Sequence, residues 1–429
     1  MGSNLNFSAK ERVINNTFDE MIARWRVSGF YHPKLIEEQW MTNLEKLRNV
    51  EVFLNKIEGL KSDLFVSGPL FVRTKEGATL KNIEQPEKVF YPTQYAKDEL
   101  MLSSVFGNLT YLAQFEIYSV NELSPRIGLF FDKNDANFRE LRKLNNSYVL
   151  VSPDERNMNL KLRMFYKRVE QAEGRKLDTM PELHTEVIEF LNKKVSTYKE
   201  KLAAVRHTQN LDSSFQEKKR KFDKYFIDLL CTYKKLYLFS LNFFIKGPSD
   251  GKFNFAEIKK DFFNSFRSNS NLKSIVGYMG TWEYDGKNDF YFRVVFFVED
   301  KLAEEQLSIV HTMIHSWESF NFTRRTKKYS HLFFTAEMSN ISESKKSLRV
   351  PICRIGKNNN QLISDFSDRV INYITLSEKF FFPAELQIFI FEHLPEDKKK
   401  KSERGIYRIE NLQYSFSRSF RGHLKKPLN

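Results

Sequence analysis

Cysteine is almost missing from this chain, and so are long apolar runs. Only Cys231 and Cys353 occur among 429 residues, too few for a disulfide framework or a cysteine-based zinc site. The longest apolar runs, such as residues 236–245, fall far short of the roughly 20 residues that cross a membrane. Residues 1–13 (MGSNLNFSAKERV) lack the apolar segment of a secretory signal. We therefore expect a soluble protein of a reducing compartment, the cytoplasm, with no membrane partner.

Glycine-rich nucleotide motifs are missing as well. The sequence has neither a Walker-type phosphate loop nor a dinucleotide fingerprint, so we expect no ATPase or dehydrogenase activity. Positive charge, by contrast, is in excess, with a formal net charge of +14. A folded protein this basic usually meets a polyanion, either nucleic acid or an acidic membrane surface. A basic surface that is merely solvated is the alternative.

The pattern along the chain divides it into four regions. Hydrophobic residues make up 41% and include 41 phenylalanines, which favours a globular protein of two or three domains. Residues 1–60 are expected to be a helical segment, and residues 61–180 a mixed α/β region. Residues 181–234 indicate a charged helical connector, and residues 235–429 a domain of more regular pattern.

Apolar spacing predicts individual elements in the first three regions. The helical segment has Trp25, Trp40, Leu44 and Leu47 as apolar anchors. In the mixed region, strands at 126–131 and 147–153 flank a helix at 137–144. In the connector, helices are predicted from Pro181 to about 205 and over 216–235. The charge of the connector favours an exposed helix face over a dedicated binding element.

The fourth region alternates strands and helices. Strands are predicted at 236–245, 274–284, 289–300 and either 329–338 or 347–356, with helices at 254–266 and 304–320. The order β-α-β-β-α-β predicts a split-βαβ, ferredoxin-like antiparallel sheet, so the fold class is α+β with a largely helical N-terminal part. A helix at 365–380, a strand at 386–394, a lysine run and an Arg- and Ser-rich tail follow.

The strand at 289–300 has an unusual number of aromatic residues. Phe290, Phe292, Val294 and Phe296 face one way, and Tyr291, Arg293, Val295 and Phe297 face the other. This periodicity alone predicts an ordinary core strand.

Five short motifs in the fourth region occur in a known order. They are GYMGTWE (277–283), FYFRVVFF (290–297), IHSW (314–317), INYITLSEK (371–379) and RSFRGH (418–423). With them, residues 235–425 resemble the rolling-circle replication initiators of filamentous phages and related prophage proteins, within the HUH endonuclease superfamily. The resemblance implies an HUH-type domain and a DNA partner, either single-stranded or hairpin.

The resemblance also implies positions for catalytic residues. In the family, two histidines two apart on a strand hold Mg²⁺ or Mn²⁺, and a helix-borne tyrosine attacks the phosphate. The histidine positions match Phe290 and Phe292, which have no lone pair for a metal. Glu283 matches the acidic position and Tyr373 the nucleophile. Each has an alternative, a surface carboxylate for Glu283 and a core side chain for Tyr373.

A rebuilt metal site is the alternative to a lost one. His311 and His315 are four residues apart on a predicted helix, so both could face one metal together with Glu283, and His331 is a further candidate. The residues between the helical pair supply no general base, in contrast to H-E-x-x-H sites. We expect no cofactor, and Mg or Mn only if this alternative holds.

Basic and aromatic side chains of the same region predict nucleic-acid contacts. The candidates are Tyr291, Arg293, Arg324, Arg325, Lys327, Lys328, Lys379, Arg418 and Arg421. Tyr291 and Arg293 stack on a base if their sheet face is open, and are core residues if a helix covers it. Lys379 either contacts phosphate or merely ends a helix.

Together these features favour a DNA-binding, replication-initiator-like protein of a mobile genetic element or prophage. Its nuclease centre is expected to be degenerate, so that whether it is an enzyme at all stays open. One alternative is an active, metal-dependent nicking and joining enzyme with a rebuilt site. Another is a protein-interaction module of phage defence or regulation, which binds a partner through the N-terminal half.

Overall fold

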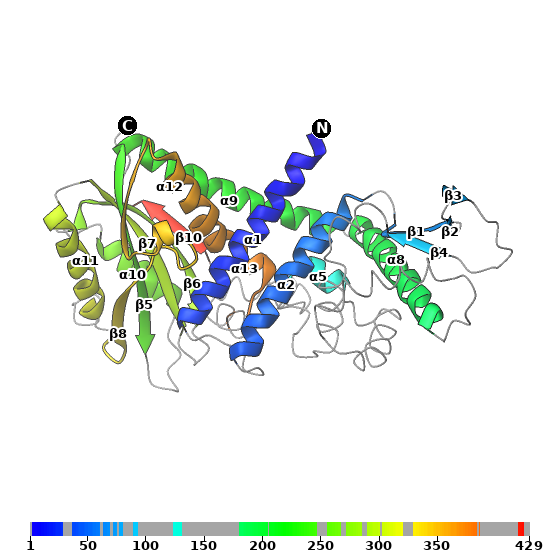
Figure 1. The fold of residues 1–429 in the computed structure, drawn as a ribbon. Coiled ribbons are helices and arrows are strands. Elements are labelled where there is room, and N and C mark those ends of the chain that lie inside the picture. Colours follow the sequence, from blue (N-terminus) through cyan, green and yellow to red (C-terminus); the bar gives the residue numbers. More distant parts are fainter. Residues whose placement is uncertain are drawn as a thin grey trace. The chain divides into compact units, whose positions relative to one another are not determined.

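The fold is described here from a computed structural model (Figure 1). It describes residues 2–28, 37–60, 63–68, 72–74, 77–79, 89–92, 123–130, 180–204, 206–246, 255–266, 272–284, 290–300, 303–320, 329–383, 386 and 419–423. Contacts divide the chain into two compact units. The first is Met1–Arg48, Ile117–Ser124 and Gln209–Asn429, and the second is Asn49–Glu116 and Pro125–Thr208. The N-terminal residues therefore belong with the C-terminal sheet, a grouping that the expected regions do not contain.

An antiparallel sheet forms the centre of the first unit. In chain order its elements are β5 (Lys235–Lys246), α10 (Phe255–Phe266), β6 (Ile275–Tyr284), β7 (Phe290–Glu299), α11 (Ala303–Glu318), β8 (Phe333–Ser339), β9 (Ile352–Gly356) and β10 (Ser419–His423). The strands lie in the order β10-β6-β7-β5-β8, and β9 also pairs with β5. The predicted combination of helices and antiparallel strands is confirmed. Both candidates for the fourth strand join the sheet, since β8 and β9 pair with different parts of β5.

Helices α10 and α11 cover one face of this sheet (Figure 1). Phe292 of β7 is fully buried there, with its ring 5.0 Å from Phe243 of β5 and 5.2 Å from Trp317 of α11. Phe262 of α10 lies 4.5 Å from the Trp317 ring. Large side chains at every second strand position thus form an aromatic core, because alternate residues of a strand share a face.

Other helices cover the opposite face. Phe226 of α9 (Arg206–Tyr233) and Phe366 both contact Phe297 of β7, with ring separations of 5.8 and 6.0 Å. Tyr225 of α9 lies so near β6 that a Cβ at Gly277 would come within 2.1 Å of its hydroxyl oxygen. Glycine at 277 therefore allows α9 to pack closely on the sheet. The alternation predicted for β7 is confirmed, and both of its faces are buried.

The helix predicted at 365–380 is present and is interrupted by a π-helical turn. It consists of α12 (Asn360–Asp365), the π-helical turn Phe366–Ile371 and α13 (Asn372–Phe380). The Asn359 side chain caps α12 by accepting a hydrogen bond from the Leu362 amide. All of α13 is buried, and π-helical turns are often found at functional sites.

The N-terminal helices α1 (Gly2–Ser28) and α2 (Glu37–Glu58) confirm the predicted helical segment. Phe18 of α1 contacts Phe380 of α13 at a ring separation of 5.3 Å. Trp25 and Trp40 stack on one another, and the Phe381 ring lies 5.1 Å from Trp40. The predicted anchors Trp25, Trp40, Leu44 and Leu47 are all buried. Helix α1 is therefore an integral part of the first unit.

The second unit contains the end of α2, α5 (Pro125–Phe130), α8 (Met180–Ala204) and two small strand pairs. The pairs are antiparallel: β1 (Phe65–Gly68) with β4 (Val89–Pro92), which are not consecutive strands, and β2 (Val72–Thr74) with β3 (Gly77–Thr79). Tyr198 of α8 donates to Glu58, which also pairs with Arg126. The long helices predicted for the connector are present as α8 and α9.

The strand predicted at 126–131 is wrong, because residues 125–130 form helix α5. Pro125 occupies the first helical position, where a missing amide hydrogen costs nothing. Ile127 and Phe130 are buried one helical turn apart, and Phe130 packs against Tyr198. The elements predicted at 137–144, 147–153 and 386–394 lie outside the described residues, apart from Leu386. Among the helices that the structure describes, none has the length and apolar character needed to span a membrane.

The aromatic core under α10 and α11 predicts a large cost for removing Phe292. Phe292→Ala should lower the free energy of unfolding by about 3–5 kcal/mol, since a fully buried phenyl ring is replaced by a cavity. Chemical denaturation measures this loss. Phe333→Ala is the control, because Phe333 of β8 is 73% exposed and should cost far less. Equal losses for the two variants would contradict the packing described for this face.

Candidate functional site

Polar side chains gather on the sheet face opposite α10 and α11. In the pairing of β6 with β7, Glu283 lies opposite Tyr291 and Thr281 opposite Arg293. Directly opposed residues of antiparallel strands share a face, so the four side chains point the same way. The Tyr291 hydroxyl donates to Glu283 Oε2 at 2.9 Å, and both side chains are buried. The sheet thus presents a carboxylate, a phenol and a guanidinium side by side.

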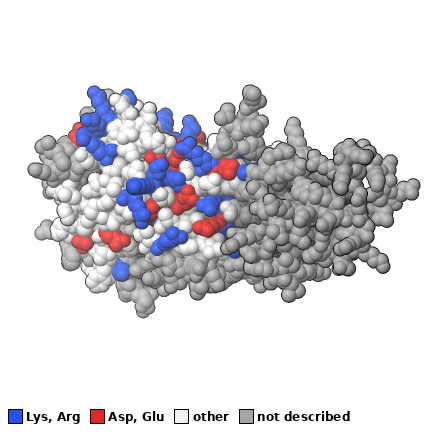
Figure 2. Space-filling model, in the orientation of Figure 1, with Lys and Arg blue, Asp and Glu red and all other residues white. Residues whose placement is uncertain are grey.

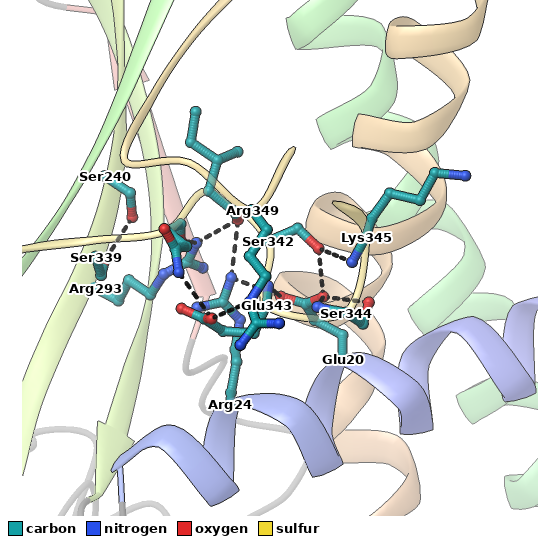
Figure 3. A network of polar contacts seen from close by, with 12 residues as sticks. Glu20, Arg24, Ser240, Arg293, Ser339, Ser342, Glu343, Ser344, Lys345 and Arg349 are labelled. Carbon is teal, nitrogen blue, oxygen red and sulfur yellow. Dashed lines mark hydrogen bonds and ion pairs between the residues drawn. The ribbon is translucent and has the colours of Figure 1, made fainter. Parts of the chain in front are cut away.

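Two arginines from distant parts of the chain converge at this face (Figure 3). Arg293 Nη2 donates to the carbonyl oxygens of Asn340 and Ile341 at 3.0 and 2.6 Å. Arg24 Nη2 of α1 donates to the same Ile341 oxygen at 2.8 Å. Arg24 and Arg293 are 5% and 1% exposed, so two buried positive charges lie next to one another. Such a pair is stable only where negative charge compensates it.

Glu20, one turn before Arg24 on α1, supplies that charge. Its Oε1 lies 2.6 Å from Arg24 Nη2 and accepts from the Glu343 amide at 2.9 Å. Its Oε2 accepts from the Ser342 hydroxyl at 2.6 Å, and from the Ser344 hydroxyl and amide at 2.6 and 3.1 Å. Figure 3 shows the segment between β8 and β9 wrapped around this carboxylate. We call Glu20, Arg24 and Ser342–Ser344 the carboxylate clasp.

The clasp keeps Glu20 ionised. Burial alone would raise the pKa of Glu20, but Arg24 and the three donor residues outweigh it and hold the pKa below the ordinary value. Burial likewise opposes the charge of Arg24, yet Glu20, Glu283 and Tyr373 raise its pKa above the usual value. Glu20 and Arg24 therefore form a buried ion pair that holds α1 on the sheet.

Tyr373 of α13 completes the group. It is fully buried, and the guanidinium carbon of Arg24 lies 5.1 Å from the centre of its ring. Burial lowers the pKa of Arg293 to about 10, and the neighbouring Arg24 charge adds to this effect. Burial and Glu283 raise the pKa of Tyr291 well above its usual value, so its hydroxyl stays protonated. We call Glu283, Tyr291, Arg293 and Tyr373, together with Arg24, the charge cluster.

The four positions singled out by the family resemblance do not form one site. Glu283 and Tyr373 lie at the charge cluster, whereas Phe292 lies in the aromatic core on the opposite sheet face. Phe290, on the same face as Phe292, stacks on Tyr284 at 4.6 Å. The family-matched positions Phe290 and Phe292 therefore lie apart from Glu283 and Tyr373. The β7 side chains on the Tyr373 face are Tyr291 and Arg293.

Burial also decides the alternatives for three predicted nucleic-acid contacts. Tyr291 and Arg293 are 4% and 1% exposed, so neither presents a ring or guanidinium plane to a base. Of the two alternatives, the structure shows the second, in which the sheet face is covered and Tyr291 and Arg293 are core residues. Lys379 is 8% exposed, and its ammonium lies 5.6 Å from the Phe380 ring. It belongs to the buried end of α13, which agrees with the alternative that Lys379 ends a helix.

The predicted histidine alternative is not assembled either. His311 and His315 are exposed on α11, which covers the aromatic face, while Glu283 lies on the other face. His331 is exposed before β8. In the part of the chain that the structure describes, no three His, Cys, Asp or Glu side chains come together as metal ligands. The charge cluster has two phenols, two guanidinium groups and a single carboxylate, Glu283, and this set does not fit a divalent metal, because the guanidinium charges repel it.

Of the remaining predicted nucleic-acid contacts, only Arg421 lies within the described residues. Arg324, Arg325, Lys327, Lys328 and Arg418 lie outside the described residues. Arg421 lies on β10 and is exposed. The family-matched tail RSFRGH is thus largely a strand that pairs with β6, a role that the sequence analysis did not predict.

Sequence reasoning missed Glu20 and Arg24 altogether. The available signal was a Glu and an Arg four residues apart within the apolar stripe of α1, where Phe18, Met21 and Trp25 are buried. Charged residues at that spacing usually lie on a solvated face, so the pattern alone did not indicate a buried pair.

No protein-family model, curated protein or solved structure matches this chain.

Glu20→Gln should destabilise the protein by about 3 kcal/mol at neutral pH, because it leaves the buried Arg24 without its counterion. Chemical denaturation of the full chain measures the loss. Glu217→Gln is a control, since Glu217 forms only exposed i,i+3 and i,i+4 pairs on α9 and should leave the midpoint nearly unchanged.

Acid should remove the difference between wild type and Glu20→Gln. The folded-state pKa of Glu20 is lowered, so its contribution is complete above the ordinary pKa of 4.5 and is lost as pH falls toward the folded-state value. Denaturation midpoints measured from pH 7 downward should therefore converge below about pH 4.5. A gap that stays constant, or widens, would contradict an ionised Glu20 in the clasp.

Proposed function

We propose that this chain is a DNA-binding, replication-initiator-like protein of a mobile genetic element or prophage, and that its nuclease centre is degenerate. The observation that carries this proposal is the charge cluster. Glu283 and Tyr373, which match the acidic and nucleophilic positions of the family, reach the same sheet face from separate elements. There both side chains are buried, next to Arg24 and Arg293.

The strand order supports an HUH-type ancestry. Along the chain the elements run β5-α10-β6-β7-α11-β8, and in space the strands run β8-β5-β7-β6. A split-βαβ sheet has this connectivity and this order. The fold alone does not define a function, since many binding modules and enzymes share it. It is the fold in combination with the cluster that favours an initiator.

Burial of Tyr373 argues against cleavage. A tyrosine attacks a phosphodiester only if its oxygen reaches the phosphorus atom, and Tyr373 is 0% exposed beneath α1 and the sheet. Opening this face would break the carboxylate clasp. An initiator fold in this state can bind DNA on its outer surface but cannot bring DNA to Tyr373.

Surface charge supports binding to DNA. The chain has a net charge of +14, and Figure 2 shows Lys and Arg side chains gathered in patches on the described surface, with acidic residues among them. Exposed cations of the first unit include Arg220, Lys221, Lys224, Lys346 and Arg349. Contacts of such residues with phosphates release counterions, which makes affinity fall steeply with salt.

The proposal predicts DNA binding without cutting. A fluorescently labelled hairpin and a labelled single strand should bind the full chain at low salt, with log affinity falling linearly against log salt. Supercoiled plasmid incubated with the protein and Mn²⁺ should stay supercoiled. Wild type and Tyr373→Phe should behave alike in both assays.

Two outcomes would contradict this prediction. Nicking by wild type that Tyr373→Phe abolishes would show an active nicking and joining enzyme. Absence of DNA binding at low salt would favour a protein-interaction module.

A further inference from the structure

Arg421 of β10 is held on the surface of α9 by two aromatic rings. Its guanidinium carbon lies 5.1 Å from the centre of the Tyr225 ring and 5.5 Å from that of Phe222. Both distances fall within the range of a cation–π contact. The Tyr225 hydroxyl donates to the carbonyl of Gly422 at 2.6 Å, and Phe420 packs near the rings of Phe263 and Trp282. β10 is therefore fixed on both faces, and so is the base of the Arg421 side chain.

The guanidinium edge of Arg421 remains available. The residue is exposed, and none of the described residues accepts a hydrogen bond from it or pairs with it. Arg354 of β9 has a similar aromatic environment but a different ionic partner. It is also exposed and lies 5.5 Å from a tyrosine ring, that of Tyr237, but it pairs with Asp300. The two arginines differ mainly in whether an acid neutralises them.

Neighbouring lysines on α9 extend the positive charge around Arg421. Residues three or four apart on a helix are neighbours, so Lys221 lies next to both Tyr225 and Lys224. Lys221 and Lys224 are exposed. Lys221 is 3.6 Å from Glu217, and the described part of the chain shows no ion pair at Lys224. In contrast, Lys218 and Lys219 are paired with Glu378 and Asp223 and are mostly buried.

The sequence around β10 is basic on both sides. Arg418 precedes the strand, and Lys425 and Lys426 follow it. A chain of phosphates along this edge of the sheet would meet cations from two elements.

We propose that Arg421, with Lys221 and Lys224, is the surface that binds the phosphodiester backbone of nucleic acid. This inference rests on the proposed DNA-binding function and assigns it a place. A guanidinium in contact with two rings has less freedom to lose on binding, and its planar fork of N–H groups suits bidentate contact with a phosphate. The buried charge cluster takes no part in this contact.

The test compares four variants of the full chain by fluorescence anisotropy with a labelled single-stranded oligonucleotide over a series of salt concentrations. Arg421→Ala should weaken binding roughly three- to tenfold at low salt and reduce the slope of log affinity against log salt by about one. Lys221→Ala/Lys224→Ala removes two charges and should reduce the slope by about twice as much. Arg354→Ala is the matched control and should leave affinity and slope within about twofold of wild type.

Arg421→Lys separates contact from scaffold. It keeps the charge and loses the planar edge, so it should restore the salt slope but only part of the affinity. Thermal unfolding of each variant shows whether β10 remains in place, and the double lysine variant tests the surface without touching β10. If wild type binds DNA, and Arg421→Ala and the double lysine variant bind as tightly as Arg354→Ala does, this inference is overturned. The proposed function would still stand. A wild type that binds no DNA would overturn the proposed function itself.

Discussion

One buried carboxylate holds the first unit in its observed form. Glu20 is fully buried, and a buried carboxylate is stable only where charge and hydrogen bonds replace water. For Glu20, Arg24 on the next turn of α1 supplies the charge, and the Ser342–Ser344 segment supplies the hydrogen bonds. Because these donors lie between β8 and β9, the need to satisfy Glu20 fixes α1 against the sheet and brings Arg24 over Tyr373.

The same constraint decides which surfaces can act. Glu283 of the sheet and Tyr373 of α13 are both buried, with Arg24 of α1 lying over the Tyr373 ring, so neither side chain is open to a substrate. The outer edge, where β10 meets α9, carries an exposed arginine without an acidic partner among the described residues. We therefore infer a protein that binds nucleic acid at the edge of its sheet and keeps the positions related to catalysis in its interior.

Periodicity predicted most of the sheet, because the two faces of β7 follow from alternation alone and Phe292 and Trp317 are large enough to define a core. Periodicity was wrong at 126–131, because a short apolar run fits either a strand or a helix. Pro125 favours the helix, since proline is well tolerated at the first helical position. Periodicity does not tell which strand face a distant helix covers, and Phe292 lies on the face opposite Glu283 and Tyr373. The carboxylate clasp could not be predicted, since Ser342 is 322 positions from Glu20. No local pattern links residues so far apart.

Helix α1 stays closed over Tyr373 as long as the first unit is folded. Native-state hydrogen exchange of the full chain measures this directly, because it gives the free energy at which each amide opens. We expect the amides of residues 14–25 in α1 to open with the same free energy as those of β7. Opening of α1 at a free energy lower by more than about 2 kcal/mol would show that the face is exposed without global unfolding, and would contradict the account.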